Sequence, residues 1–162
     1  NMTIEAWVDP ATAGNVWKPI IGKSYKGTQL SYVVQGITPM NGAPSLYLAP
    51  AANNLVGSSP LPTNTWSHVA ATYDGTTVRL YVNGVLVASQ AQTGSPTPST
   101  DALQIGSDGM LGAFWNGTID EVRIYNKALT ASAIQTDMNT PVVSSVVVPL
   151  TPPSNLQPVS AQ

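Results

Sequence analysis

The sequence predicts an all-β protein, an antiparallel β-sandwich or jelly roll with one short helix near its C-terminal end. Only 9% of the 162 residues are charged, whereas 43% are hydrophobic. The chain contains 13 glycines and 14 prolines, and these turn formers separate short runs of β-branched and aromatic residues. Because residues that favour helices are scarce, a helical bundle is excluded. At this length we expect one domain with a buried core.

Four short runs in the first third of the chain are typical of strands, because turn-forming residues bound each of them. They are Met2–Val8, Val16–Gly22, Leu30–Val34 and Ser45–Leu48. The first run alternates between the two faces of a strand. Its apolar face, which is expected to point into the core, carries Ile4, Ala6 and Val8, and its opposite face carries Thr3, Glu5 and Trp7.

The clearest unit is a three-stranded meander in the middle of the chain. Strands are predicted at Trp66–Tyr73, Val78–Val82 and Val85–Val87. The turns between them contain Asp74-Gly75 and Asn83-Gly84. These pairs tolerate the positive φ angles that a two-residue hairpin turn requires, so consecutive strands are expected to pair.

Two further strands and one helix complete the predicted domain. The strands are Leu103–Ile105 and Ile119–Tyr125, and the helix covers Thr130–Gln135 with Thr130 as its N-cap. Many short strands joined by turns favour a sandwich or jelly roll. We therefore place the domain at residues 1–140.

A proline-rich tail follows at residues 141–162. Its prolines surround Val146–Val148, so we interpret most of the tail as an interdomain linker whose valines could dock as an edge strand. The segment Thr151–Leu156 resembles the opening of a fibronectin type III module. This resemblance favours an origin in a multidomain protein.

The composition also excludes several classes of partner. The net charge is −2 and the six basic residues form no cluster, so a nucleic-acid footprint is absent. No apolar run approaches the roughly 20 residues of a membrane span, which argues against membrane insertion. The chain has no cysteine, and hence no disulfide or thiolate site. A β protein with low charge and many Thr and Ser residues is typical of secreted bacterial modules, so we expect an extracellular or cell-surface location.

Three segments, taken in order, resemble one known family. They are Thr3–Val8, Trp66–Gly84 and Phe114–Tyr125, and the resemblance continues through Ala128–Thr130 and Ile134. Together they resemble the laminin-G-like, concanavalin A-like jelly-roll domain of secreted and surface bacterial proteins, over about residues 2–139. The resemblance implies two packed antiparallel sheets. It also implies that the domain binds carbohydrate or another extracellular ligand as an appendage of an enzyme or adhesin.

One departure from the family's pattern concerns its first strand. Members usually begin with a further strand and an Asp-, Asn- and Gly-rich loop before the segment that matches Thr3–Val8, whereas here that segment comes first. We expect the additional strand to be missing from this chain, supplied by the tail around Val146, or lost.

Asp120 is the candidate metal ligand. On a regular strand it shares a face with Val122 and Ile124, so its carboxylate is expected to point inward, where it needs a partner. The resemblance implies one structural Ca²⁺ with Asp120 as an oxygen ligand, although Ca²⁺ takes about six to eight oxygens. Alternatively, a bulge at Gly117 resets the alternation and Asp120 bonds backbone amides. Three other aspartates lie in predicted turns, where Asx turns explain them: Asp74, Asp101 and Asp108.

Sugar binding requires aromatic rings at the surface, which stack on the apolar face of a sugar, together with amides and hydroxyls. Four aromatic residues on or near loops are our candidates for ligand binding: Trp17, Trp115, Tyr25 and Tyr47. Trp7 and Trp66 fall inside strand motifs and are expected to be packing residues.

A catalytic site is not predicted. The only histidine, His68, has no nucleophile or orienting carboxylate beside it in the sequence, and it is expected on a strand opposite Arg79 or Tyr81. The two glutamates, Glu5 and Glu121, form no paired motif of the kind that glycoside hydrolases need. An enzymatic function would require Glu5, Glu121 or His68 to cluster in an open groove.

We therefore predict a non-catalytic carbohydrate-binding module that tethers a secreted multidomain protein to a polysaccharide. The alternative is a structural or adhesive surface domain that binds protein or acts as a spacer. The low charge and the proline-rich tail suit both hypotheses, so glycan binding itself discriminates between them.

Overall fold

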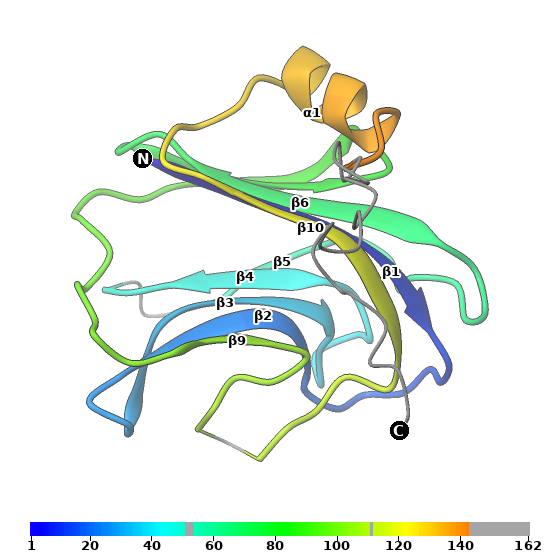
Figure 1. The fold of residues 1–162 in the computed structure, drawn as a ribbon, viewed down its shortest axis with the longest axis horizontal. Coiled ribbons are helices and arrows are strands. Elements are labelled where there is room, and N and C mark those ends of the chain that lie inside the picture. Colours follow the sequence, from blue (N-terminus) through cyan, green and yellow to red (C-terminus); the bar gives the residue numbers. More distant parts are fainter. Residues whose placement is uncertain (51–53, 111, 143–162) are drawn as a thin grey trace, which may run out of the picture.

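The computed structural model describes residues 1–50, 54–110 and 112–142. Two antiparallel sheets of five strands face one another (Figure 1). The first sheet contains, in spatial order, β10 (Gly117–Tyr125), β1 (Met2–Pro10), β6 (Ser67–Tyr73), β7 (Thr77–Val82) and β8 (Val85–Ala91). The second sheet contains β5 (Leu55–Val56), β4 (Ser45–Leu48), β3 (Gln29–Ile37), β2 (Lys18–Tyr25) and β9 (Leu103–Ile105). The predicted all-β sandwich is confirmed.

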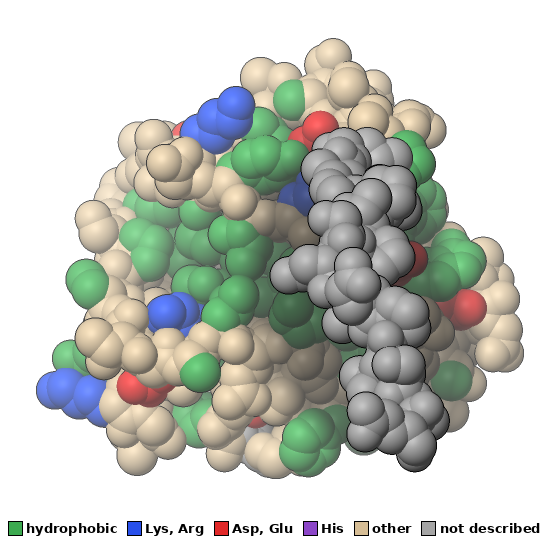
Figure 2. All heavy atoms as spheres, in the orientation of Figure 1, with side chains coloured by type: hydrophobic (Ala, Val, Ile, Leu, Met, Phe, Trp, Pro, Cys, Tyr) green, Lys and Arg blue, Asp and Glu red, His purple; other side chains and the backbone are tan. Residues whose placement is uncertain are grey.

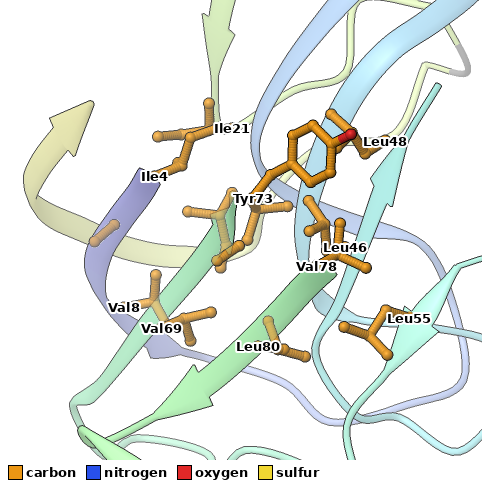
Figure 3. Packing of buried hydrophobic residues seen from close by; sticks show 14 of the residues in the cluster. Ile4, Val8, Ile21, Leu46, Leu48, Leu55, Val69, Tyr73, Val78 and Leu80 are labelled. Carbon is orange, nitrogen blue, oxygen red and sulfur yellow. The ribbon is translucent and has the colours of Figure 1, made fainter. Parts of the chain in front are cut away.

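The hydrophobic core lies between the two sheets, and most strands contribute alternate side chains to it (Figure 3). The predicted apolar face of β1 is confirmed, since Ile4, Ala6 and Val8 are at most 1% exposed. The other large members of the buried cluster include Ile20, Ile21, Val34, Leu46, Leu48, Val69, Tyr73, Val78 and Leu80. The side chains on the outer faces of both sheets point away from this core.

Helix α1 (Ala131–Met138) lies on the outer face of the first sheet (Figure 1). The hydroxyl of Thr130 accepts a hydrogen bond from the Ala133 amide at 3.2 Å, which confirms the predicted N-cap. Ile134 is fully buried and packs against Ala70 of β6 and Tyr81 of β7. This contact fixes the helix over β6 and β7, and its C-terminal end lies beside β1.

Apolar side chains line the edge of the sandwich between β9 and β10. Ile105 of β9 pairs with Ile21, and Ile124 of β10 pairs with Ile4, so both face the core side of their sheets. Ile105 is nevertheless 55% exposed and Ile124 is 46% exposed. Figure 2 shows hydrophobic side chains gathered between the two sheets.

The nine strands predicted within residues 1–140 are all present, and their ends differ from the predicted ends by at most four residues. The two-residue strand β5 was not predicted, because so short a run carries no alternation. The expectation that His68 lies opposite Arg79 or Tyr81 is wrong. Those residues pair with Thr72 and Ala70, whereas the His68 amide donates to Oδ1 of Asn83 at 2.8 Å.

The predicted valine strand at residues 146–148 and most of the predicted linker lie outside the described residues. In the part of the chain that is described, no helix has the length and apolarity needed to span a membrane.

Candidate functional site

Tyr47 lies on the outer face of the second sheet. Its neighbours Leu46 and Leu48 point into the core, so the alternation of β4 turns the tyrosine ring outward. The ring borders a hollow of about 450 Å³ whose polar lining comes from Gln29 and Thr97. The remaining walls are Leu30, Ala49, Pro50 and Met110. An aromatic ring beside an amide and a hydroxyl has the chemistry that sugar recognition requires.

A second hollow lies at the neighbouring β2–β3 hairpin. Tyr25 ends β2 and pairs with Gln29, which itself lines the first hollow. The Tyr25 ring, Lys26 and residues 98–101 line this second hollow of about 310 Å³. The Lys26 ammonium lies 5.0 Å from the centre of the Tyr25 ring. We call the residues that line the two hollows the tyrosine surface.

Hydrogen bonds hold residues 97–101 against the β2–β3 hairpin. The Ser31 hydroxyl donates to the Thr97 carbonyl at 2.6 Å, and the Ser99 hydroxyl donates to the Ser24 carbonyl at 2.6 Å. A carboxylate oxygen of Asp101 accepts from the Ser24 hydroxyl at 3.0 Å and from the Gly27 amide at 2.8 Å. Asp101 therefore ties two distant segments together rather than closing its own turn, and residues 97–101 are held against the β2–β3 hairpin.

The other two predicted binding residues lie at the opposite end of the β2–β3 pair from Tyr25. Trp17 is half-buried directly before β2. Trp115 packs on Gly36 so closely that a Cβ at Gly36 would lie 2.4 Å from the indole ring. The indole N–H of Trp115 donates to the Thr118 carbonyl at 3.2 Å. The structure thus brings the two tyrosines together and separates both tryptophans from them, and a binding role for Trp17 and Trp115 stays a prediction.

A third hollow, of about 310 Å³, lies on the outer face of the first sheet. It is lined by Trp7, Trp66, Asp120 and Glu121, and we call it the tryptophan hollow. Trp66 is 43% exposed, so the expectation that it is a packing residue is wrong. It directly precedes β6, and no alternation within a strand fixes its direction.

A β-bulge in β10 shapes this hollow. Glu5 pairs with Arg123 and Trp7 pairs with Asp120, so two residues of β10 stand opposite one residue of β1. At the bulge Glu121 adopts a φ of 52°, which is uncommon for a residue with a side chain. The alternation resets here, and Asp120 is exposed on the face of Trp7. The expectation that Asp120 points inward is therefore wrong, and the bulge that turns it outward lies at Glu121 rather than at Gly117.

The neighbourhood of Asp120 does not fit a calcium ion. One oxygen of its carboxylate accepts the Glu121 amide at 2.8 Å, and the other side chains at the hollow are Glu121 and two indole rings. Ca²⁺ takes about six to eight oxygens. Across residues 1–50, 54–110 and 112–142, no three His, Cys, Asp or Glu side chains gather as a metal site. Calcium at Asp120 stays a prediction that this geometry does not support.

A cluster of ionisable groups is buried between the first sheet and α1. Nε2 of His68 lies 4.0 Å from the Glu5 carboxylate, and Nη1 of Arg123 lies 3.8 Å from it. Burial raises the pKa of Glu5 to about 7, and the neighbouring Asp137 carboxylate adds to this rise. Burial lowers the pKa of His68 to about 4. Neither side chain reaches solvent, and Glu121 is bonded to Arg123 at 3.0 Å, so these groups do not form an open groove.

A comparison of the sequence with models of protein families finds a family with this sandwich fold. The model of the laminin-G family described as the concanavalin A-like lectin/glucanases superfamily matches residues 1–135. The chain belongs to this family. The resemblance inferred from the sequence motifs is confirmed.

This laminin-G-like domain is also similar to individual proteins. It is 39% identical to mouse (Mus musculus) pappalysin-1 over 80 residues, which is 46% of this chain and only 5% of pappalysin-1. Domain 4 of AbnA, an extracellular GH43 arabinanase from Geobacillus stearothermophilus solved with arabinotriose, superposes with a TM-score of 0.67. That match has 23% identity and covers 85% of this chain and 66% of the other.

The CBM40 of the Ruminococcus gnavus IT-sialidase, solved with α2,3-sialyllactose, gives a TM-score of 0.66 at 19% identity. The match covers 83% of this chain and 80% of the other. At such identities the two structures show a shared fold.

Proposed function

We propose that this laminin-G-like domain is a non-catalytic glycan-binding module and that the tyrosine surface is its binding site. The observation that carries the proposal is the position of Tyr47, half-buried at the wall of a hollow that also contains Gln29 and Thr97. The ring offers a face for stacking on a sugar, and the amide and hydroxyl offer bonds to sugar hydroxyls. Because hydrogen bonds already fix residues 97–101, little ordering is needed on binding.

The comparisons support a glycan as the partner. The AbnA domain was solved with arabinotriose, and the CBM40 was solved with α2,3-sialyllactose. Both have the sandwich fold of this domain, so the fold is compatible with glycan binding. In this proposal the module belongs to a secreted multidomain protein, and tethering compensates for weak binding at a single site.

The burial of Glu5 and His68 supports a binding function rather than catalysis. Glycoside hydrolysis needs two carboxyl groups that both reach the sugar. Glu5 lies beneath α1 with no exposed side-chain surface. Asp120 and Glu121 share the tryptophan hollow, but Glu121 is ion-paired with Arg123 and does not complete such a pair. The alternative of an adhesive or spacer domain is decided by the binding experiment.

The proposal is tested by affinity gels of the folded domain in a panel of plant, algal and microbial polysaccharides, beginning with arabinan. Tyr47→Ala is expected to weaken retardation at least about tenfold, equivalent to about 1.4 kcal/mol. Tyr47→Phe keeps the ring and is expected to bind nearly as well as the native domain. The matched control is Phe114→Ala, which removes an exposed ring that lines neither tyrosine hollow.

Two results would contradict the proposal. One is full retardation of Tyr47→Ala and Tyr25→Ala, which would place binding elsewhere, with Trp17→Ala and Trp115→Ala as the next variants. The other is no retardation in any polymer, which would favour the adhesive or spacer domain. The same gels with a chelator test the predicted calcium ion.

A further inference from the structure

The tryptophan hollow is lined by two aromatic rings, Trp7 and Trp66, that are not part of the hydrophobic core. Trp7 is held by its indole N–H, which donates to the Met138 carbonyl at 3.3 Å, and by an edge-to-face contact with His68 at 5.4 Å. Trp66 is 43% exposed, which is unusual for so large an apolar side chain. The hollow between them measures about 310 Å³, at the lower end of the range for small-molecule sites.

The same hollow carries two carboxylates on consecutive residues. On a regular strand consecutive side chains point to opposite faces, so Asp120 and Glu121 line one hollow only because of the bulge. The bulge places Glu121 at a φ of 52°, a conformation that costs energy in a residue with a Cβ. Strained backbone of this kind is concentrated at binding sites.

The charges in the hollow do not cancel. Glu121 is neutralised by Arg123, whose Nη2 lies 3.0 Å from its carboxylate. No Lys, Arg or His within the described ranges forms an ion pair with Asp120. The Glu121 amide bonds one oxygen of the Asp120 carboxylate, which leaves its other oxygen able to accept a further bond. The hollow is therefore negative, with aromatic rings as its other walls.

We propose that the tryptophan hollow is a second binding site, separate from the tyrosine surface, and that it takes an organic cation carrying a protonated or quaternary ammonium group. A cation is attracted to the faces of tryptophan rings and to a carboxylate. The ammonium group can belong to an amino sugar or to a choline-like group, since the chemistry that recognises it is the same.

The test titrates small probes into the ¹⁵N-labelled domain and follows the indole N–H signals of its four tryptophans by NMR. The charged probes are choline and a glucosamine oligomer. Their uncharged counterparts are 3,3-dimethyl-1-butanol, which has the shape of choline, and an N-acetylglucosamine oligomer. We expect the signals of Trp7 and Trp66 to shift with a charged probe and to stay unchanged with its neutral counterpart. A shift with choline alone, or with glucosamine alone, identifies the source of the cation.

Variants separate this site from the tyrosine surface. Asp120→Asn keeps the size of the side chain and removes its charge, and it is expected to weaken binding of the charged probe at least fivefold. Trp66→Ala is expected to abolish the shift of the Trp7 indole signal with choline, whereas Tyr47→Ala is expected to leave that shift unchanged. Equal binding of charged and neutral probes, unchanged affinity in Asp120→Asn, or no indole shift with any charged probe would overturn the proposal.

Discussion

Replacing Glu5 by glutamine or His68 by asparagine is expected to change how the stability of this domain depends on pH. Both side chains are buried beneath α1, and their nearest charged groups are Arg123 and the Asp137 carboxylate of α1. Folding raises the pKa of Glu5 from 4.5 to about 7 and lowers the pKa of His68 from 6.5 to about 4. Each change ties protonation to folding.

The two groups act in opposite directions. Between pH 4.5 and 7 the folded state holds a proton on Glu5 that the unfolded chain has released, so this group lowers stability as the pH rises. Between pH 4 and 6.5 the unfolded chain holds a proton on His68 that the folded state lacks, so this group raises stability as the pH rises. In the overlapping range the two contributions cancel, and the native domain is expected to show little net dependence from this pair.

For each group the pKa differs by about 2.5 between the folded and unfolded states, which corresponds to about 3 kcal/mol in the free energy of unfolding. Glu5→Gln removes the titrating glutamate and keeps the histidine. The free energy of unfolding of this variant minus that of the native domain should therefore rise by about 3 kcal/mol between pH 4.5 and 7. His68→Asn removes the titrating histidine and keeps the glutamate. Its free energy of unfolding minus that of the native domain should therefore fall by about 3 kcal/mol between pH 4 and 6.5.

The assay is urea denaturation followed by tryptophan fluorescence at half-unit steps from pH 4 to 8. Subtracting the native curve removes the contributions of all other titrating groups. The double variant is the control, because it lacks both slopes and should run parallel to the native domain between pH 4.5 and 6.5, where the two slopes cancel. Differences that are constant across pH for both single variants would refute the assignment of these protonation states.

Three further predictions concern stability. Leu80→Ala removes a fully buried side chain and should lower the free energy of unfolding by about 3 kcal/mol in chemical denaturation. Leu86→Ala, at 50% exposure, should lower it by less than about 1 kcal/mol, and equal losses would contradict the assignment of Leu80 to the core. Thr130→Ala should lower the free energy of unfolding by about 1 kcal/mol through loss of the N-cap hydrogen bond. Thr130→Ser keeps the hydroxyl and should retain most of this stability, and equal losses in both variants would contradict a role for the cap. Gly36→Ala should lower the melting temperature, because its Cβ would lie 2.4 Å from the Trp115 ring, and an unchanged melting temperature would show that the ring is free to move.

The strands and turns followed from local signals in the sequence. Alternation in β1 predicted which residues enter the core, and the Asn83-Gly84 pair predicted a tight turn, with Asn83 at a φ of 49°. The N-cap at Thr130 was equally predictable. Each of these features depends on residues that are close together in the chain.

The candidate sites depend on contacts between distant residues, and the predicted directions of Asp120 and Trp66 were wrong. The bulge at Glu121 could not be read from the sequence, because glutamate has no preference for positive φ, and it reverses the direction of Asp120. The aspartate at position 101 holds a hairpin 74 residues away in the chain. The sequence predicts that Trp66 is a packing residue because it falls inside a strand motif, whereas in the assembled sheet its side chain is 43% exposed.

The most direct test of the central claim is an NMR titration of the labelled domain with glycans, mapping which backbone amides shift. Arabinotriose and α2,3-sialyllactose are the first probes, followed by fragments of any polysaccharide that retards the domain. We expect saturable shifts concentrated at Gln29, Tyr47 and residues 97–101. Shifts confined to other surfaces, or none with a glycan that retards the domain in gels, would contradict it.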